Sequence, residues 1–88
     1  MPERRVELAN RRGLHARASA KFVTLASAQT ATIEVEKDGG CVCGTSIMGL
    51  MMLGAAYGDA VLIRAEGEGA DEALAALVEL VESRFGED

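Results

Sequence analysis

The amino-acid sequence predicts an α+β fold in which a four-stranded antiparallel sheet is covered on one face by two long helices and one short helix. Apolar residues alternate with other residues in several short segments, which is typical of half-buried strands. In two longer segments apolar residues recur every three or four positions, which is typical of amphipathic helices. The predicted order is strand, helix, strand, strand, short helix, strand, helix, an open-faced βαββαβα sandwich.

The first strand is expected around Val6 and Leu8, and it ends at Asn10 before the turn residue Gly13. The first helix is expected from about residue 16 to residue 27, because small and apolar side chains recur there at helical spacing. The predicted stripe consists of Ala16, Ser19, Ala20 and Val23, widened by Phe22 and Ala26.

A hairpin and a short helix are predicted next. Residues 32–36 alternate in polarity and Asp38-Gly39-Gly40 supplies a turn, so residues 41–43 are expected to return as the second strand of the hairpin. Ser46 is a favourable N-cap for a short apolar helix over residues 47–53.

The last strand is expected over residues 60–67, after the Gly58-Asp59 turn. A final helix is expected over residues 70–84, since apolar residues repeat there at helical spacing and acidic residues occupy its first turn. The side chains predicted to face the core are Leu74, Leu77, Val78, Val81 and Phe85.

The composition indicates one small acidic domain over residues 1–88. The chain has 9 Lys and Arg against 14 Asp and Glu, a net charge of −5, and 49% hydrophobic residues. At this length only about 60% of the unfolded surface is buried on folding, so any chemistry is expected at the surface. The longest apolar stretch, residues 47–57, is shorter than the roughly 18 residues of a membrane span, and no signal peptide is recognisable. A cytoplasmic location without membrane insertion is expected.

The charge is distributed unevenly along the chain. Residues 1–21 carry six basic and two acidic residues, whereas residues 22–88 carry three basic and twelve acidic residues. A basic segment on an acidic body predicts a local docking surface for an anionic group, either phosphate or an acidic protein face. Nucleic-acid binding is not expected, because the total is acidic and only 3% of the residues are aromatic.

The two cysteines, Cys41 and Cys43, are separated by one residue. This spacing on a strand is unfavourable for a local disulfide, so both are expected to be reduced thiols. They lack the further Cys or His ligands of a metal site, and neither a metal nor a cofactor is predicted.

The single histidine, His15, lies between the turn at Gly13 and the first predicted helix. A phosphoryl group on His15 would accept hydrogen bonds from the unpaired amides of Ala16, Arg17 and Ala18 at the helix start. Arg17 adds a planar, permanently charged donor, and the helix field favours a neutral, nucleophilic ring. The alternative is that a histidine without an acid partner is an ordinary surface residue or helix cap.

The segment 47–53 contains more large apolar side chains than a short helix can bury, so some of them are expected to be exposed for partners. The alternative is that all of them face the core and that Ser46 is only an N-cap.

Two segments together resemble the signature segments of the HPr family, the histidine-containing phosphocarriers of the bacterial phosphotransferase system. The segments are Gly13-Leu14-His15-Ala16-Arg17 and Ser46-Ile47-Met48-Gly49, with Ser46 31 positions after His15. Chain length, element order and the Ala- and Leu-rich last helix are also similar to that family, so the resemblance covers essentially the whole chain.

The resemblance implies that His15 receives a phosphoryl group on Nδ1 from Enzyme I, which takes it from phosphoenolpyruvate, and passes it to Enzyme IIA. It implies that Arg17 steadies the phosphate and that Ser46 is a regulatory site for an HPr kinase/phosphorylase. The docking face implied for these partners consists of Ala16, Ala20, Lys21, Ile47, Met48 and Met51.

The sequence departs from the family pattern at several positions. Ala18 replaces the usual proline after the arginine, which removes a preset first helical turn. Thr24, Ser27 and Gly49 stand where sugar-transporting relatives carry lysines, so attraction to an acidic Enzyme IIA is expected to be weaker. The absence of lysines at these three positions favours the nitrogen-related regulatory branch slightly over sugar uptake.

Three other functional classes are alternatives to a phosphocarrier. A regulatory binding module of the same fold would act through Ser46 and the Met-rich segment without carrying phosphate on His15. A small metal-binding domain would require a Cys-x-x-Cys loop before the first helix, and the sequence has none. A stand-alone enzyme is not expected, because no second acid, base or metal cluster accompanies His15. A monomer is expected, since the apolar patch is assigned to transient partners.

Overall fold

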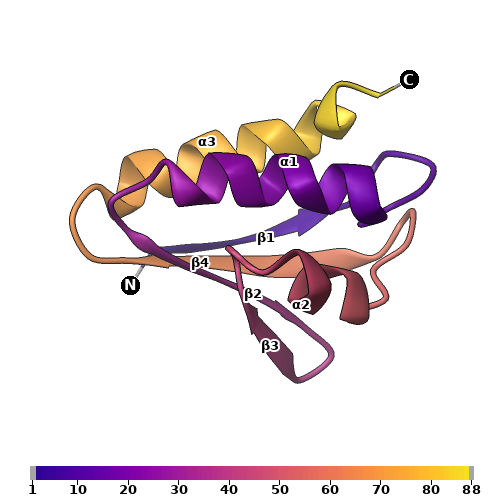
Figure 1. Cartoon of the computed structure of the whole chain (residues 1–88), viewed down its shortest axis with the longest axis horizontal. Helices are drawn as coiled ribbons and strands as arrows, with labels where there is room; N and C mark the ends of the chain where they lie inside the picture. The colour runs from indigo at the N-terminus through magenta and orange to yellow at the C-terminus, as the bar shows by residue number, and fades with distance from the viewer. Residues whose placement is uncertain (1, 88) are drawn as a thin grey trace.

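The computed structural model describes residues 2–87, which form a sheet with the helices on one side (Figure 1). The elements in chain order are β1 (Glu3–Glu7), α1 (Ala16–Ser27), β2 (Thr32–Lys37), β3 (Gly40–Cys43), α2 (Ile47–Met52), β4 (Ala60–Glu66), α3 (Ala70–Glu82) and the 3-10 turn η1 (Arg84–Gly86). The spatial order of the strands is β1-β4-β2-β3, and every neighbouring pair is antiparallel. The predicted fold class and element order are therefore confirmed.

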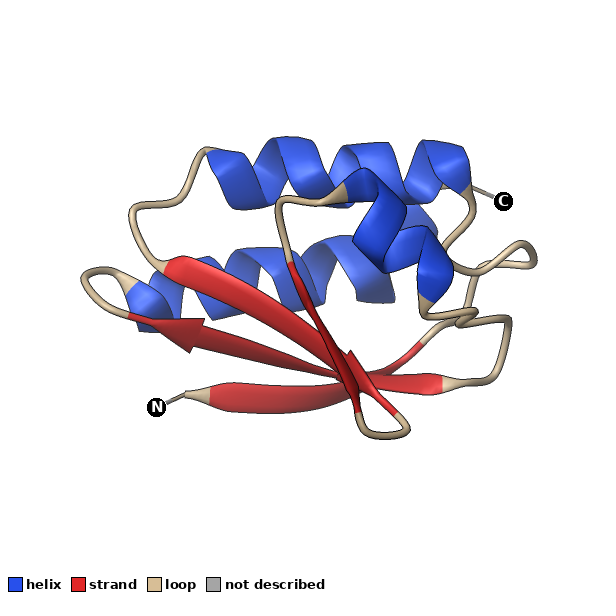
Figure 2. Ribbon diagram, turned by 60° about the horizontal axis from the view of Figure 1, so that its bottom comes forward, coloured by secondary structure: helices blue, strands red, loops and turns tan. Residues whose placement is uncertain are grey.

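The helices lie on one side of the sheet (Figure 2), and the hydrophobic core combines buried side chains of the strands and the helices. Side chains alternate between the two faces of each strand, so one face of the sheet is apolar. On that face Val35 lies opposite Ile63 in the register of β2 and β4, and both are buried. Phe22 from α1 and Leu77 from α3 are buried in the same core.

The buried side of α1 differs from the predicted stripe. Phe22 is the largest buried side chain of this helix, and residues three or four positions away from it share its side. Ala16 is consequently exposed and Ala20 half-buried, which corrects their predicted place in the core stripe. The buried residues of α1 are Ala18, Ser19, Phe22 and Ala26.

Helix α3 ends at Glu82, two residues before the predicted end. Arg84 and Phe85 have φ angles of 61° and 56°, and left-handed residues cannot continue a right-handed helix. Phe85 is nevertheless buried, as predicted for the core side of this segment. Helix α1 has the predicted bounds, and the ends of β2, β3, α2 and β4 lie within one residue of the prediction. Strand β1 ends at Glu7, three residues before the predicted end at Asn10. Within residues 2–87, the helices are all too short or too polar to cross a membrane.

The connection between β1 and α1 packs closely against the segment after α2. Gly13 has a φ of 61°, and a Cβ atom at this position would lie 2.4 Å from the carbonyl oxygen of Ala55 and 2.7 Å from Cα of Ala56. The amide of Leu14 donates to the same Ala55 oxygen at 3.0 Å, and the Leu14 side chain is buried. This close approach fixes the backbone immediately before His15.

We expect Gly13→Ala to destabilise the fold more than Gly54→Ala. Gly54 also has a left-handed φ, of 65°, but a Cβ atom there would meet nothing within 4 Å. Both substitutions introduce left-handed strain of about 1 kcal/mol, and only Gly13→Ala adds an overpacking penalty of about 1–3 kcal/mol. Urea unfolding of the two variants measures the difference, and equal losses of unfolding free energy would contradict the packing argument.

Candidate functional site

His15 is the N-cap residue of α1, with an extended backbone at φ −73° and ψ 179°. Its carbonyl oxygen accepts from the amide of Ser19 at 2.8 Å, whereas its ring makes no capping hydrogen bond. Ser19 is buried, and its hydroxyl donates to the carbonyl oxygen of Leu14 at 3.1 Å. The backbone of His15 is therefore fixed on both sides while its ring, 21% exposed, stays available for chemistry.

The first three backbone amides of α1 have no hydrogen-bond acceptor within residues 2–87. They are the N–H groups of Ala16, Arg17 and Ala18. Such amides carry the positive end of the helix dipole and form a site suited to an anion. The structure thus places all three residues that were predicted to cradle a phosphoryl group beside His15.

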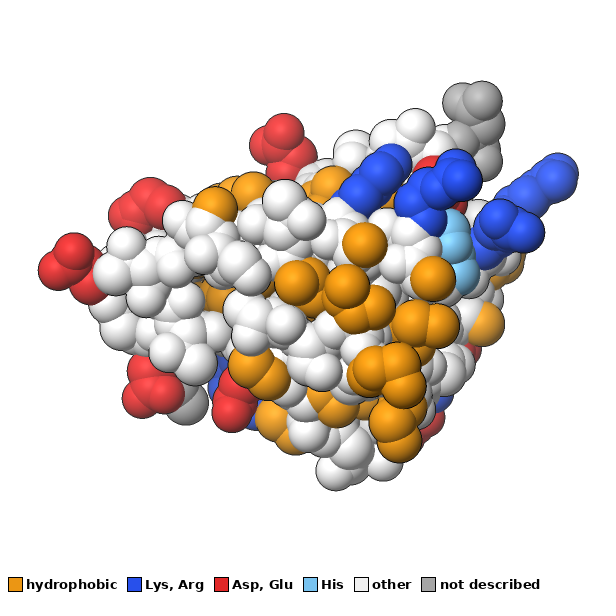
Figure 3. Space-filling view, in the orientation of Figure 1, with side chains coloured by type: hydrophobic (Ala, Val, Ile, Leu, Met, Phe, Trp, Pro, Cys, Tyr) orange, Lys and Arg blue, Asp and Glu red, His pale blue; other side chains and the backbone are white. Residues whose placement is uncertain are grey.

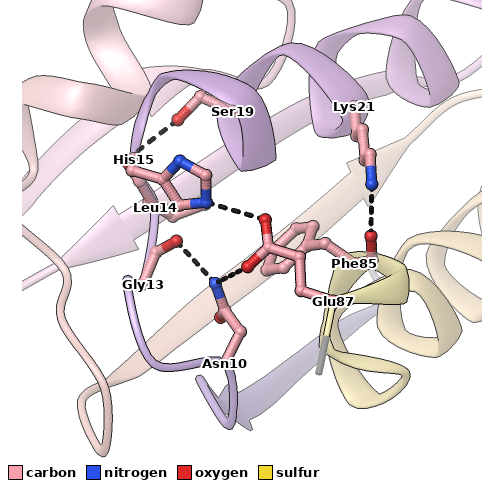
Figure 4. Close-up of polar contacts among 8 residues, drawn as sticks. All are labelled: Asn10, Gly13, Leu14, His15, Ser19, Lys21, Phe85 and Glu87. Carbon is pink, nitrogen blue, oxygen red and sulfur yellow. Dashed lines mark hydrogen bonds and ion pairs between the residues drawn. The ribbon is translucent and has the colours of Figure 1, made fainter.

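An acid partner for His15 is present, which corrects the expectation that the histidine has none. The Nε2 atom of His15 lies 2.7 Å from Oε2 of Glu87, which approaches from the C-terminal segment (Figure 4). Nδ2 of Asn10 donates to the other oxygen of Glu87 at 3.2 Å and to the carbonyl oxygen of Gly13 at 2.8 Å. Glu87 and Asn10 are site residues that sequence reasoning missed.

The environment of Glu87 favours its ionised form. Burial alone would raise the pKa of this carboxyl group, but the hydrogen bonds from His15 and Asn10 and the charges of His15 and Lys21 outweigh it. The pKa of Glu87 consequently lies below its usual value. Glu87 is therefore a carboxylate at neutral pH.

The turn η1 directs Glu87 back toward His15. Its three residues, Arg84, Phe85 and Gly86, all have left-handed φ angles, which reverse the chain after α3. Lys21 of α1 donates from Nζ to the carbonyl oxygen of Phe85 at 2.7 Å. Lys21 was expected in a docking face, and the structure places its charged end on this turn.

Arginine side chains surround the ring of His15. A shallow hollow of about 340 Å³ is lined by Arg11, Arg12, His15, Arg17 and Glu87. The three arginines are exposed and form no ion pair with residues 2–87. Figure 3 shows Lys and Arg side chains gathered around the histidine, next to a group of hydrophobic side chains. The hollow is therefore positively charged and adjoins an apolar surface.

The apolar side chains of α2 are largely exposed, as predicted. Ile47 and Met51 are each 41% exposed and Met48 is 67% exposed, whereas Leu50 is fully buried. The alternative in which all of them face the core is therefore wrong. Because α1 and α2 are in contact, these side chains extend the surface that begins at Ala16.

Ser46 is the N-cap of α2. Its hydroxyl oxygen accepts from the amide of Gly49 at 3.0 Å, as the sequence predicted. The side chain of Ser46 is only partly buried.

Cys41 and Cys43 are exposed free thiols on the edge strand β3. Hydrogen bonds with Thr45 lower the pKa of Cys43. Within residues 2–87 no cluster of three His, Cys, Asp or Glu side chains could hold a metal ion.

Comparison of the sequence and structure with known proteins identifies one family. The family model described as the PTS HPr component phosphorylation site matches residues 2–83. The phosphocarrier protein HPr of Pseudomonas aeruginosa is 47% identical over 88 residues, covering 99% of this chain and 98% of that protein. The phosphocarrier protein NPr of Shewanella violacea is 38% identical, covering 97% and 93% of the two chains.

A solved structure agrees with these sequence matches. The crystal structure of HPr-C-His from Thermoanaerobacter tengcongensis superposes with a TM-score of 0.96 at 49% identity. The match covers 100% of this chain and 99% of that chain. This chain therefore belongs to the HPr family of phosphocarrier proteins of the bacterial phosphotransferase system.

Proposed function

We propose that this phosphocarrier accepts a phosphoryl group on Nδ1 of His15 from phosphorylated Enzyme I and passes it to an Enzyme IIA component. The observation that carries the proposal is the position of the ring beside three unpaired amides at the start of α1. The free N–H groups of these amides are already positioned to donate hydrogen bonds to a phosphate, so no rearrangement is needed when it binds. Arg17 supplies a further donor from the rim of the same hollow.

The chain acts as a carrier and its partners supply most of the catalysis. His15 contributes one positioned nucleophile, and the shallow hollow around it does not enclose a substrate. A phosphoramidate has a reactive P–N bond, so the phosphoryl group passes readily onward from the imidazole. We therefore infer no stand-alone enzymatic activity.

The partners dock on the apolar surface of α1 and α2 beside the arginines. The proposed docking residues are Ala16, Ala20, Lys21, Ile47, Met48 and Met51. Exposed methionines adapt to differently shaped partners, and the arginine rim attracts acidic faces. Positions 24, 27 and 49 carry no positive charge, so the attraction is concentrated near His15. This chain acts as a cytoplasmic monomer that meets Enzyme I and Enzyme IIA in turn.

Ser46 is the proposed regulatory site, phosphorylated by an HPr kinase/phosphorylase. A phosphate at the N-terminus of α2 is favoured by the helix dipole, so the fold tolerates it. The phosphate adds about −2 charge next to Ile47 and Met48, where the acidic partners bind. Phosphorylation is therefore expected to weaken docking.

We expect phosphoenolpyruvate and Enzyme I of the same organism to place one acid-labile phosphoryl group on the wild-type chain and none on His15→Ala. Arg17→Ala is expected to be phosphorylated more slowly, by about tenfold or more, because it lacks one phosphate donor. Mass spectrometry of the intact protein over time measures both. If the wild type acquires no phosphoryl group, the chain is a regulatory binding module that acts through Ser46 and the Met-rich surface of α2.

We expect Ser46→Asp to slow phosphoryl transfer by about tenfold or more, equivalent to about 1.4 kcal/mol, without changing the fold. Aspartate caps a helix as well as serine does but adds a negative charge. The control is Ser46→Asn, which keeps a good cap without the charge and should transfer at nearly the wild-type rate. Slow transfer together with a collapsed circular dichroism spectrum of Ser46→Asp would show that the effect is unfolding.

A further inference from the structure

The geometry points to Glu87 as a positioning residue that keeps a proton on Nε2 of His15 and thereby keeps Nδ1 free to accept the phosphoryl group. This inference rests on the proposed function, in which Nδ1 of His15 is the acceptor. The contacts run from Asn10 through Glu87 to His15, and they link the loop after β1 to the segment after α3 (Figure 4).

The hydrogen bond between His15 and Glu87 has a defined direction. A carboxylate can only accept, so the contact of 2.7 Å requires the proton to be on Nε2 of His15. In a neutral ring the second nitrogen, Nδ1, then carries a lone pair. Nδ1 makes no hydrogen bond with residues 2–87 and lies on the side of the ring away from Glu87 (Figure 4).

Asn10 holds the carboxylate in the orientation that this bond needs. Its side chain is fully buried, and its amide nitrogen faces two acceptors, Gly13 O at 2.8 Å and Glu87 Oε1 at 3.2 Å. Two acceptors fix which end of the Asn10 amide is the NH₂ group. Its Oδ1 atom is buried without a hydrogen-bond partner in residues 2–87, which is energetically unfavourable. We infer that the hydrogen bonds donated by the NH₂ group of Asn10 outweigh this cost.

The C-terminal turn holds Glu87 in place at an energetic cost. Left-handed conformations at Arg84 and Phe85 are unfavourable by about 1–2 kcal/mol each. Burial of the Phe85 ring and the hydrogen bond from Lys21 to its carbonyl oxygen offset this strain. Strained backbone of this kind is often found near functional groups, and here it lies two and three residues before Glu87.

The carboxylate of Glu87 also stabilises the positive charge that develops on the His15 ring during phosphoryl transfer. The lone pair on Nδ1 forms the new bond to phosphorus, while the bond from phosphorus to the donor breaks and its electron pair stays with the donor. Positive charge then develops on the ring, which retains its Nε2 proton. Glu87 stabilises this charge from the opposite edge of the ring, as the acid of a catalytic triad does for its histidine.

The amide variant tests the direction of the bond. In Glu87→Gln the side-chain oxygen is expected to keep accepting from Asn10, because rotating the amide would set two NH₂ groups against each other. The Gln NH₂ group would then face Nε2 of His15 as a donor. Nε2 would have to accept, and the proton would move to Nδ1, the atom that must attack.

The experiment compares the full-length wild type with Glu87→Gln, Glu87→Ala and the control Glu68→Gln. Glu68 is exposed and has no hydrogen bond or ion pair within residues 2–87, in the turn that leads into α3. Nitrogen-15 NMR of the neutral ring shows which nitrogen is protonated, and His15 is the only histidine, so its signals need no further assignment. Mass spectrometry with phosphorylated Enzyme I gives the rate of transfer for each protein.

We expect Nε2 to be protonated in the wild type and in Glu68→Gln, and Nδ1 to be protonated in Glu87→Gln. Phosphorylation of Glu87→Gln should be slower than that of the wild type by about 100-fold or more, with Glu87→Ala between them. Protonation on Nε2 in Glu87→Gln, or a rate equal to that of the wild type, would overturn the proposal. If even the wild type is not phosphorylated on His15, the proposed function fails, and the NMR result still decides whether Glu87 sets the tautomer.

Discussion

The close approach of the backbone at Gly13 to Ala55 is the constraint on which the site depends. No side chain fits between these two segments, and the Leu14 amide binds the Ala55 oxygen there. Leu14 is buried beside this contact, and the next residue, His15, is the N-cap of α1 with a partly exposed ring. One packing contact thus determines where the helix begins and which residue stands at its positive end.

The loop after β1 and the segment after α3 meet at this helix start. Asn10 comes from the loop after β1, whereas Glu87 comes from the segment after α3, 72 positions after His15. The left-handed turn between α3 and Glu87 is stable because Phe85 fills part of the core that the sheet and helices share. The geometry around His15 therefore depends on the packing of the whole domain and not on the local motif alone.

Local patterns were sufficient to predict the parts of the site that lie next to one another in sequence. Spacing and residue type were enough to predict the start of α1 at Ala16, the cap formed by Ser46 and the exposure of Met48. Glu87 could not be predicted in this way, because its position depends on a turn made by Arg84 and Phe85, neither of which favours a left-handed backbone. Asn10 looked like an ordinary strand end, since only the folded chain shows what its amide binds.

The central claim is that the ring nitrogen left free by Glu87 is the one that carries phosphate. Phosphorus-31 NMR of the phosphorylated protein tests this directly, because histidines phosphorylated on Nδ1 and on Nε2 give different signals. The account predicts a signal from phosphate on Nδ1 of His15. A phosphate on Nε2, the atom that contacts Glu87 at 2.7 Å, or on a residue other than His15 would contradict it.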